Sequence, residues 1–261
     1  EILGISGILN GTTNFILTKM KNEGADFATV LKEAQALGYA EADPTADVEG
    51  IDAARKIVIL AALAYGVLLD PKSISTTGIT GITADHTAVA DKLGGAIKLI
   101  GHTERIDGRV LAMVSPFLIP AGNPVCHVDG VFNGILVDAN MLGRALFYGA
   151  GAGKLPTASA VVADILDILS HKEGERLSPV WRRAKTEDVA DANAFVCRRC
   201  YLIEGCPRCA EKAKGALGAE ICEFVREGAF FVVSRPMSGK EAEEALASTG
   251  LEAVFCLPVL D

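Results

Sequence analysis

The sequence predicts an α/β protein with two successive units that each contain a sheet. The first observation is the apolar run from Asp52 to Gly66, whose composition and periodicity are typical of a buried helix that ends at a glycine. The second is a set of short apolar or alternating stretches between turn residues, as in sheet strands. The third is a strand–helix–strand–strand–helix–strand order after residue 196. With 50% hydrophobic residues among 261, the chain can bury a sizeable core.

The first unit opens with a strand that enters a loop and a helix over residues 2–20, followed by a short helix over 27–37 that Gly38 closes. After the long helix, residues 70–81 form a turn. The pattern then predicts one helix followed by three strands, at Ala88–Ile97, Lys98–Thr103, Val110–Pro116 and Val131–Ala139. The glycine-rich turn AGAGKLP precedes a last helix, Thr157–Ser170.

The second unit follows a charged stretch, His171–Asn193, that reads as a linker. We place the domains at 1–184 and 197–261, with the linker proper at 185–196. The second unit is predicted to have helices at 207–217 and 240–248 and strands at 199–204, 220–226, 229–235 and 253–259. This order is that of the ferredoxin-like arrangement.

An acidic cluster lies before and within the start of the long helix. The segment GYAEADPTADVEGIDAARK holds five carboxylates and one lysine in nineteen residues. Asp52 and Lys56 are spaced i and i+4, so they share one helical face. A surface ion pair is one interpretation, but the apolar residues that follow favour a helix start that enters a core, where Lys56 could donate a proton. Three acidic groups around one ammonium donor suit a small substrate with an ammonium group of its own.

The upstream carboxylates have alternative interpretations. Asp47 occupies the position of an N-cap, so helix capping and ligand binding are both open for it. Glu41 precedes it in a loop that could face a ligand.

Composition and spacing exclude several other functions. A net charge of −8 argues against a nucleic-acid or anionic-membrane surface. No apolar run approaches the roughly 18 residues of a membrane-spanning helix. Seven cysteines in such a chain are more typical of reduced thiols than of a disulfide framework. The four histidines show no ligand spacing, and we expect them at the surface or in loops.

Three blocks of the first unit resemble the catalytic domain of homoserine dehydrogenase. They are GILNGTTNFIL (7–17), EAQALGYAEADPTADVEGIDAARK (33–56) and FYGAGAGKLPTASAVVADI (147–165). The resemblance implies an oxidoreductase with a mixed sheet that uses NADP or NAD to interconvert L-aspartate 4-semialdehyde and L-homoserine. It also implies a cytoplasmic enzyme of threonine and methionine biosynthesis that forms a homodimer or higher oligomer, with no nucleic-acid or membrane partner.

The resemblance also assigns roles to individual residues. It implies that Lys56 is the proton donor, with Asp52 beside it in the catalytic machinery. Glu41 and Asp52 correspond to substrate-binding carboxylates, and Thr12 to a position near the substrate. From the acidic cluster itself we also expect Asp47 in the substrate site, with helix capping as its alternative. Gly38 and Gly151 fall where the backbone approaches the cofactor. On spacing alone, the turn at Gly151 is more typical of close packing than of a dinucleotide fingerprint. No metal ligand is implied.

One part of the family pattern is missing from the sequence. We find no glycine-rich dinucleotide loop after a first strand, and the chain opens within the catalytic domain. We therefore interpret it as a fragment and expect the isolated chain not to turn over. The residues that discriminate NAD from NADP would lie in the absent Rossmann domain.

The second unit resembles an ACT domain, a regulatory module that binds amino-acid effectors. Its first turn, EGCPR (204–208), departs from that family's Asp-x-Pro-Gly turn. An amino-acid sensor without catalytic activity is therefore an alternative function. Two CxxC pairs, Cys197 with Cys200 and Cys206 with Cys209, suggest zinc. A strand at 199–204 would separate the pairs by about 20 Å, too far for one tetrahedral site.

Overall fold

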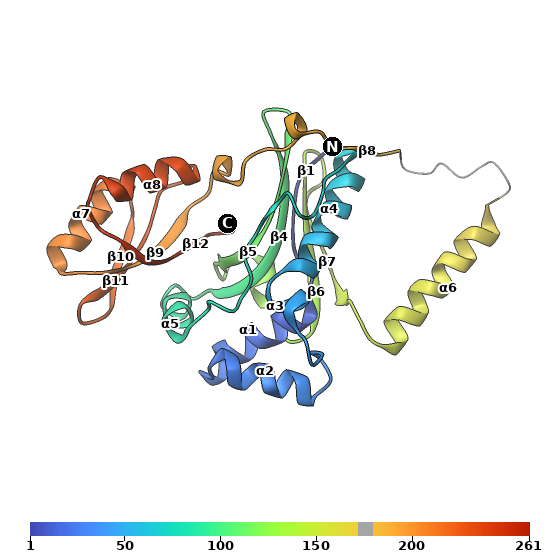
Figure 1. Ribbon diagram of the computed structural model, residues 1–261, viewed down its shortest axis with the longest axis horizontal. Coiled ribbons are helices and arrows are strands. Elements are labelled where there is room, and N and C mark those ends of the chain that lie inside the picture. Colours follow the sequence, from blue (N-terminus) through green and yellow to red (C-terminus); the bar gives the residue numbers. More distant parts are fainter. Residues whose placement is uncertain (172–179) are drawn as a thin grey trace.

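The computed structural model describes residues 1–171 and 180–261, which form an α/β protein with two main sheets (Figure 1). The strands are β1 (Ile2–Ile8), β2 (Val67–Leu68), β3 (Ser75–Thr76), β4 (Ala96–Ile106), β5 (Arg109–Ile119), β6 (Phe132–Ala139), β7 (Gly143–Ala150), β8 (Arg182–Arg183), β9 (Arg199–Glu204), β10 (Ile221–Arg226), β11 (Ala229–Val233) and β12 (Ala253–Pro258). The α-helices are α1 (Gly11–Glu23), α2 (Phe27–Ala36), α3 (Thr45–Val48), α4 (Ile51–Tyr65), α5 (Ala84–Lys92), α6 (Lys154–Ser170), α7 (Pro207–Leu217) and α8 (Gly239–Ala247). Short 3-10 helices are η1 (Pro124–His127), η2 (Thr186–Asp188) and η3 (Ala192–Ala194).

The larger sheet has six strands in the order β3-β5-β4-β1-β6-β7. Its neighbours pair antiparallel, except that β3 runs parallel to β5. The sheet is therefore mixed, which confirms the predicted fold class. The N-terminal strand β1 lies in its interior between β4 and β6, so the residues that follow β1 start from a fixed position.

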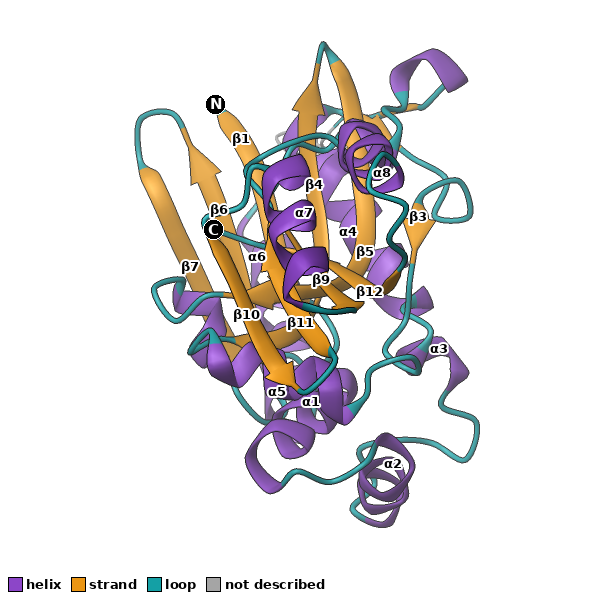
Figure 2. Ribbon diagram, turned by 90° about the vertical axis from the view of Figure 1, so that its left-hand side faces the viewer, coloured by secondary structure: helices purple, strands orange, loops and turns teal. Residues whose placement is uncertain are grey.

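The second sheet has four antiparallel strands in the order β10-β11-β9-β12. With α7 and α8 side by side over one face, this is the ferredoxin-like arrangement (Figure 2). The predicted helix at 207–217 and first strand at 199–204 have the bounds predicted for them, and the other elements differ by one or two residues. The domain boundaries themselves stay a prediction.

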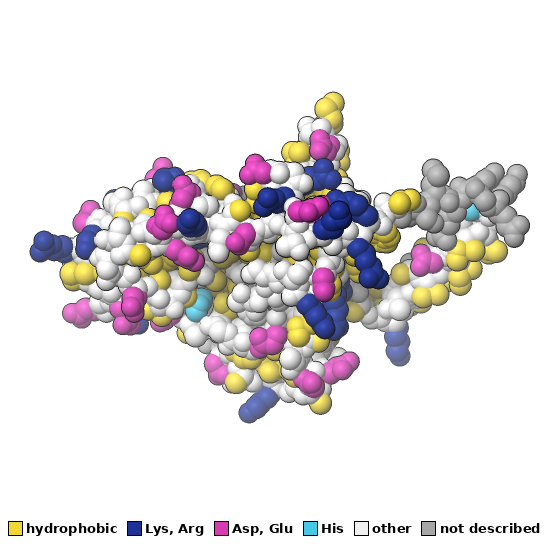
Figure 3. Space-filling model, turned by 45° about the horizontal axis from the view of Figure 1, so that its top comes forward, with side chains coloured by type: hydrophobic (Ala, Val, Ile, Leu, Met, Phe, Trp, Pro, Cys, Tyr) yellow, Lys and Arg dark blue, Asp and Glu magenta, His cyan; other side chains and the backbone are white. Residues whose placement is uncertain are grey.

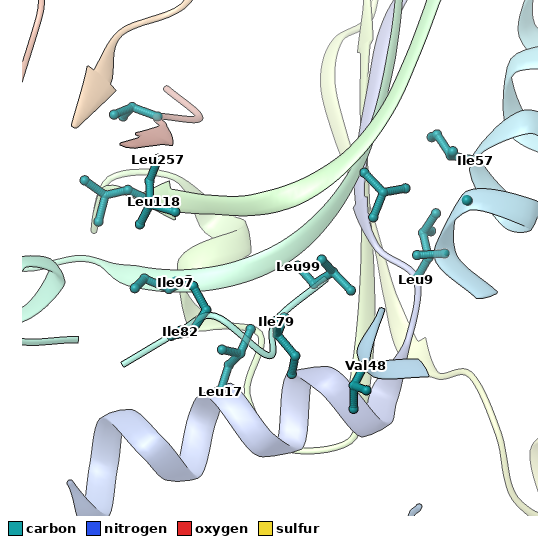
Figure 4. Packing of buried hydrophobic residues seen from close by; sticks show 14 of the residues in the cluster. Leu9, Leu17, Val48, Ile57, Ile79, Ile82, Ile97, Leu99, Leu118 and Leu257 are labelled. Atoms are coloured by element: carbon teal, nitrogen blue, oxygen red, sulfur yellow. The ribbon is translucent and has the colours of Figure 1, made fainter. Parts of the chain in front are cut away.

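The main hydrophobic core lies between the six-stranded sheet and the helices α1 and α4. Leu9, Leu17, Ile57 and Leu99 belong to this core, and all are at most 3% exposed (Figure 4). Alanines at positions 53, 54, 61 and 62 let α4 lie close to the sheet, and Gly101 of β4 leaves room for Ile57. The first turn of α4 is thereby held against the strands.

Several predicted elements of the first unit differ from the structure, among them the strands predicted at 98–103 and 110–116, which extend to β4 and β5. The helix predicted at Ala88–Ile97 is α5, which begins earlier because Thr83 and His86 form a capping box, and Ala96 already belongs to β4. The last helix of the first unit begins at Lys154 and includes Pro156 in its first turn, where proline is tolerated. The 70–81 turn contains the short strand β3.

The predicted linker is also more ordered than expected. Residues 172–179 lie outside the described part, but β8 pairs parallel with β2, and Val189 bridges Val110 of β5. The backbone N–H of Arg182 donates to the carbonyl of Gly66 at 3.0 Å. Backbone hydrogen bonds therefore attach the segment before the second sheet to the first unit.

Two histidines are buried, which corrects the expectation that all four lie in loops or at the surface. His86 is 8% exposed and stacks on Phe255 of β12, and His102 is 5% exposed. Within residues 1–171 and 180–261, no helix has the length and apolar character needed to span a bilayer. Figure 3 shows acidic and basic side chains interspersed on the surface and hydrophobic ones along α6, which has no buried residue.

Candidate active site

A cavity of about 490 Å³ lies where α1, α3 and α4 begin and where β7 leads into α6. Figure 1 shows these segments at the same end of the larger sheet. Most of the residues predicted to form the site line this cavity, including Thr12, Gly38, Asp47, Asp52, Lys56 and Gly151. Segments far apart in the sequence thus meet at one opening.

The pair of Lys56 and Asp52 has the geometry of a strong charged hydrogen bond. Lys56 Nζ lies 2.6 Å from Asp52 Oδ2, one helical turn away on α4. The same ammonium donates to the carbonyl oxygen of Leu9 at 2.9 Å. An ammonium group has three N–H donors, so these two contacts orient it while a third donor is left for a ligand. The lysine side chain is 47% exposed, which gives a ligand access to it.

Asn10 is a site residue that the sequence interpretation did not single out. Its amide Nδ2 donates to Asp47 Oδ1 at 2.7 Å and to Asp52 Oδ2 at 2.9 Å. Its Oδ1 accepts from the backbone N–H of Thr13 at 2.9 Å, so the residue also caps α1. Its role as an N-cap could be predicted from the sequence, because asparagine is a favoured residue directly before a helix. The bridge to two carboxylates requires the tertiary fold.

Asp47 does not cap the long helix, which corrects one of its two interpretations. The N-cap of α4 is Gly50, with φ of 78° and no side-chain capping bond. The left-handed backbone at this position favours glycine. A larger residue would also be crowded, because its Cβ would lie 3.1 Å from Val114 and 3.2 Å from Thr76. Asp47 lies instead in α3, where Asn10 holds it at the cavity.

Thr12 and Gly38 connect α1 with the turn after α2. Thr12 Oγ1 donates to the carbonyl of Tyr39 at 2.6 Å, and both residues line the cavity. Gly38 has φ of 76°, a conformation that favours glycine, and places its backbone at the cavity wall. The hydroxyl of Thr12 therefore fixes the cavity wall and is already engaged.

Gly151 lies against Asn133 of β6, and both residues line the cavity. A Cβ at Gly151 would lie 2.2 Å from Asn133 Nδ2, so only glycine fits without movement. Among the described residues, Asn133 Oδ1 is buried without a hydrogen-bond partner. Asn133 was missed because an asparagine within a strand carries no local signal of function. Its open acceptor marks this wall as a place for a ligand donor.

Glu41 is the one predicted site residue that does not line the cavity. Its side chain is exposed, two residues after Tyr39, and its backbone carbonyl accepts from Gln35 Nε2 at 3.0 Å. Its part in ligand binding therefore stays a prediction, supported by its charge and by its place close along the chain to Tyr39, which lines the cavity.

A buried lysine joins α1 to the segment that leads into β6. Lys98 is 1% exposed and its Nζ donates to Asn14 Oδ1, to Val128 O and to Asp129 Oδ1, at 3.1, 2.7 and 2.8 Å. Burial lowers its pKa, while the hydrogen bond to Asp129 opposes that shift. These bonds tie α1 to the segment before β6. Val131 at the end of that segment and Asn133 in β6 line the cavity.

The cysteine pairs lie outside this cavity. Strand β9 forms at Arg199–Glu204, as predicted; Cys200 lies near its start and Cys206 follows its end. In the part of the chain that the structure describes, no group of three or more histidine, cysteine or acidic side chains is arranged to hold a metal ion.

The sequence matches a family model described as homoserine dehydrogenase over residues 1–166. Homoserine dehydrogenase of Neisseria gonorrhoeae is 52% identical over 168 residues, which are 64% of this chain and 39% of that protein. The Synechocystis enzyme is 48% identical over 188 residues, covering 69% and 43% of the two chains. The chain therefore spans less than half the length of these relatives.

Solved structures agree over the whole of this chain. The homoserine dehydrogenase of Thiobacillus denitrificans has a TM-score of 0.89 and 34% identity, covering 100% of this chain and 64% of that one. A Staphylococcus aureus homoserine dehydrogenase has a TM-score of 0.84 and 35% identity. The match covers 100% of this chain and 66% of that one. With the match over residues 1–166, these likenesses show that the chain belongs to the homoserine dehydrogenase family.

Proposed function

We propose that this chain carries the substrate half of an enzyme that interconverts L-aspartate 4-semialdehyde and L-homoserine with NADP or NAD. The observation that carries the proposal is the hydrogen-bonded pair of Lys56 and Asp52 at a cavity that glycines border on its other walls. The relatives that bear the name homoserine dehydrogenase support the substrate. An archaeal homoserine dehydrogenase described in complex with NADPH, 30% identical with a TM-score of 0.54, supports the cofactor.

The cavity walls fit a flat nicotinamide ring. Gly38 and Gly151 present backbone without a side chain, and the buried Asn133 Oδ1 offers an unpaired acceptor at the same cavity. We propose that these residues hold the cofactor together with the backbone of residues 150–153. When bound, nicotinamide supplies a hydride to the aldehyde carbon or accepts one from the alcohol.

The proposed role of Lys56 follows from its position. During reduction its Nζ donates a proton to the substrate carbonyl oxygen, and in the reverse direction the neutral amine takes the proton back. Asp52 and the carbonyl of Leu9 fix the ammonium at 2.6 and 2.9 Å before substrate arrives, so little reorganisation is needed. Asp52 thus serves as a partner of the proton donor.

The acidic side chains are proposed to bind the substrate ammonium group. Asp47 and Asp52 line the cavity on either side of Asn10. The exposed Glu41 adds a third negative charge. The Thr12 hydroxyl, whose proton is donated to the Tyr39 carbonyl, offers its oxygen to the substrate as an acceptor. Charge-assisted hydrogen bonds of this kind both hold and orient a small amino acid.

The proposal also covers the assembly, regulation and location of the protein. Exposed Leu146, Phe147 and Tyr148 on the edge strand β7 support a homodimer or higher oligomer. The ferredoxin-like unit supports binding of an amino-acid effector. The substrates are small metabolites of threonine and methionine biosynthesis, and we propose a cytoplasmic location.

A chimera tests the activity. The present chain would replace the matching region of the N. gonorrhoeae enzyme, whose remaining residues supply the rest of the fold. We expect homoserine-dependent reduction of NAD(P)⁺, with kcat about a hundredfold lower for Lys56→Ala because a general acid and base is lost. Lys92→Ala, at an exposed lysine of α5, is the matched control and should keep full activity. A folded chimera without activity, or a Lys56→Ala variant with normal kcat, would contradict the proposal.

A further inference from the structure

A pair of cysteines lies at the junction between β9 and α7, in the second unit and away from the cavity. Cys206 Sγ and Cys209 Sγ are 3.1 Å apart. Cys206 is the N-cap of the eleven-residue helix α7, and Pro207 occupies its first turn. The backbone N–H of Cys209 also donates to the Cys206 carbonyl at 2.9 Å, so the fold itself holds the two sulfur atoms together.

The residues around this pair hold the two sulfur atoms close to each other. A Cβ at Gly205 would lie 2.8 Å from Cys209 Cβ and 3.2 Å from its Sγ, so the glycine makes room for the second sulfur. The N–H of Gly205 donates to the Gly228 carbonyl at 2.8 Å, which fixes the turn. Cys206 is exposed and Cys209 is half-buried against the core of the second unit. One sulfur therefore faces solvent and the other lies behind it.

The two cysteines differ from the buried thiols of the chain. The hydrogen bond from Cys209 Sγ lowers the pKa of Cys206, as does the backbone N–H of Cys209. Burial instead raises the pKa of Cys197 to about 11 and that of Cys200 to about 12. At neutral pH the exposed Cys206 is thus far better suited to react as a thiolate than the buried pair.

We propose that Cys206 and Cys209 form a redox-active dithiol, which low-molecular-weight disulfides oxidise to an intramolecular disulfide. The Cys206 thiolate attacks one sulfur of the small disulfide, forms a mixed disulfide and releases one thiolate. Cys209 loses its proton, attacks Cys206 Sγ and releases the second thiolate. The protein dithiol loses two electrons and two protons, and the small disulfide becomes two thiols.

Tryptic digestion provides a direct test, because Arg208 lies between the two cysteines. The purified 261-residue chain is treated with oxidised glutathione, alkylated and digested without reduction. We expect peptides 200–208 and 209–212 to appear joined by a disulfide, and to separate after reduction. Their absence, or a link from 209–212 to the Cys222 peptide 215–226, would overturn the proposal.

Matched variants identify the attacking sulfur. Cys206→Ser should remove the joined peptides and slow the initial formation of mixed disulfide about tenfold or more at pH 7. Serine is itself a favoured N-cap, so this variant should fold, which circular dichroism would check. Cys222→Ser, at a half-buried thiol whose pKa is raised by burial, is the control and should behave as the parent chain. Equal rates in the two variants would refute the role of Cys206.

Discussion

Asn10 donates from Nδ2 to Asp52 Oδ2 at 2.9 Å, and this is the carboxylate oxygen that Lys56 Nζ contacts at 2.6 Å. One oxygen thus accepts from both an amide and an ammonium group. Asn10 also bonds Asp47 and is only 6% exposed, so its amide is held in place. We infer that Asn10 positions the acidic side chains relative to the proton donor.

Replacing Asn10 separates this role from helix capping. Asn10→Ser keeps a capping hydroxyl but removes the amide donor, whereas Asn10→Ala removes both. A lost hydrogen bond to a charged group is worth about 1.5–3 kcal/mol, so both variants of the chimera should lower kcat by roughly tenfold to a hundredfold. Only Asn10→Ala should also lower the melting temperature clearly.

The control for this experiment is Asn123→Ser, at another capping asparagine that lies outside the cavity. It should leave kcat unchanged. An Asn10→Ser enzyme with the parental kcat would show that Asn10 only caps α1.

Glu41→Gln tests whether this exposed carboxylate binds substrate. The change keeps the shape of the side chain and removes its charge, so KM for homoserine should rise more than kcat falls. Steady-state kinetics on the chimera measure both quantities. Glu49→Gln, at an exposed carboxylate of the same segment, is the control. If both variants keep the parental KM, the carboxylate of Glu41 has no part in substrate binding.

Gly151→Ala tests the glycine wall of the cavity. Its Cβ would lie 2.2 Å from Asn133 Nδ2, so the turn or the asparagine must move. We expect the chimera to bind NADPH at least about tenfold more weakly, which corresponds to a loss of about 1.4 kcal/mol. Gly149→Ala is the matched control, because no atom lies within 4 Å of its added Cβ. Fluorescence titration with NADPH compares the two, and equal affinities would exclude Gly151 from the cofactor site.

His86 should make stability depend on pH. Burial lowers its pKa from 6.5 to about 4, although Asp85 opposes the shift. The unfolded chain therefore binds a proton between about pH 6.5 and 4 that the folded chain does not. The contribution of this residue to the free energy of unfolding should fall by up to about 3 kcal/mol as pH drops through that range.

His86→Gln should remove this contribution while keeping an acceptor for the Thr83 N–H of the capping box. Urea unfolding at several pH values gives the free energy for each protein. His127→Gln, at an exposed histidine, should retain the parental pH dependence. A His86→Gln variant with that same dependence would show that other groups cause it.

Local sequence patterns were sufficient to predict most helices and strands and the contact between Asp52 and Lys56. The i, i+4 spacing of Asp52 and Lys56 is a property of any helix, so their contact could be read from the sequence. The glycine at position 66 and the alternation of the strands are equally local signals. The family resemblance supplied the roles, which no spacing alone would have distinguished from a surface ion pair.

Long-range contacts account for what the sequence did not reveal. Asn10 meets Asp52 across 42 positions and Lys98 meets Asn14 across 84, so neither contact has a local signature. A lysine in an alternating strand is normally exposed, yet Lys98 is buried because three oxygen acceptors converge on it. His86 was misjudged for a related reason, since its stacking partner Phe255 belongs to the second unit.

The end of the chain returns to the larger sheet. Val259 forms a parallel bridge with Leu118 of β5, and the Leu260 N–H donates to the Leu118 carbonyl at 3.0 Å. Buried Leu202 and Phe231 of the second sheet belong to the same core cluster as Leu118. Separating the two sheets would expose these apolar side chains to water, which is unfavourable. The unfolding of one sheet is therefore coupled to the unfolding of the other. Heat or denaturant should therefore melt both in one cooperative step, although the sequence divides so readily into two units.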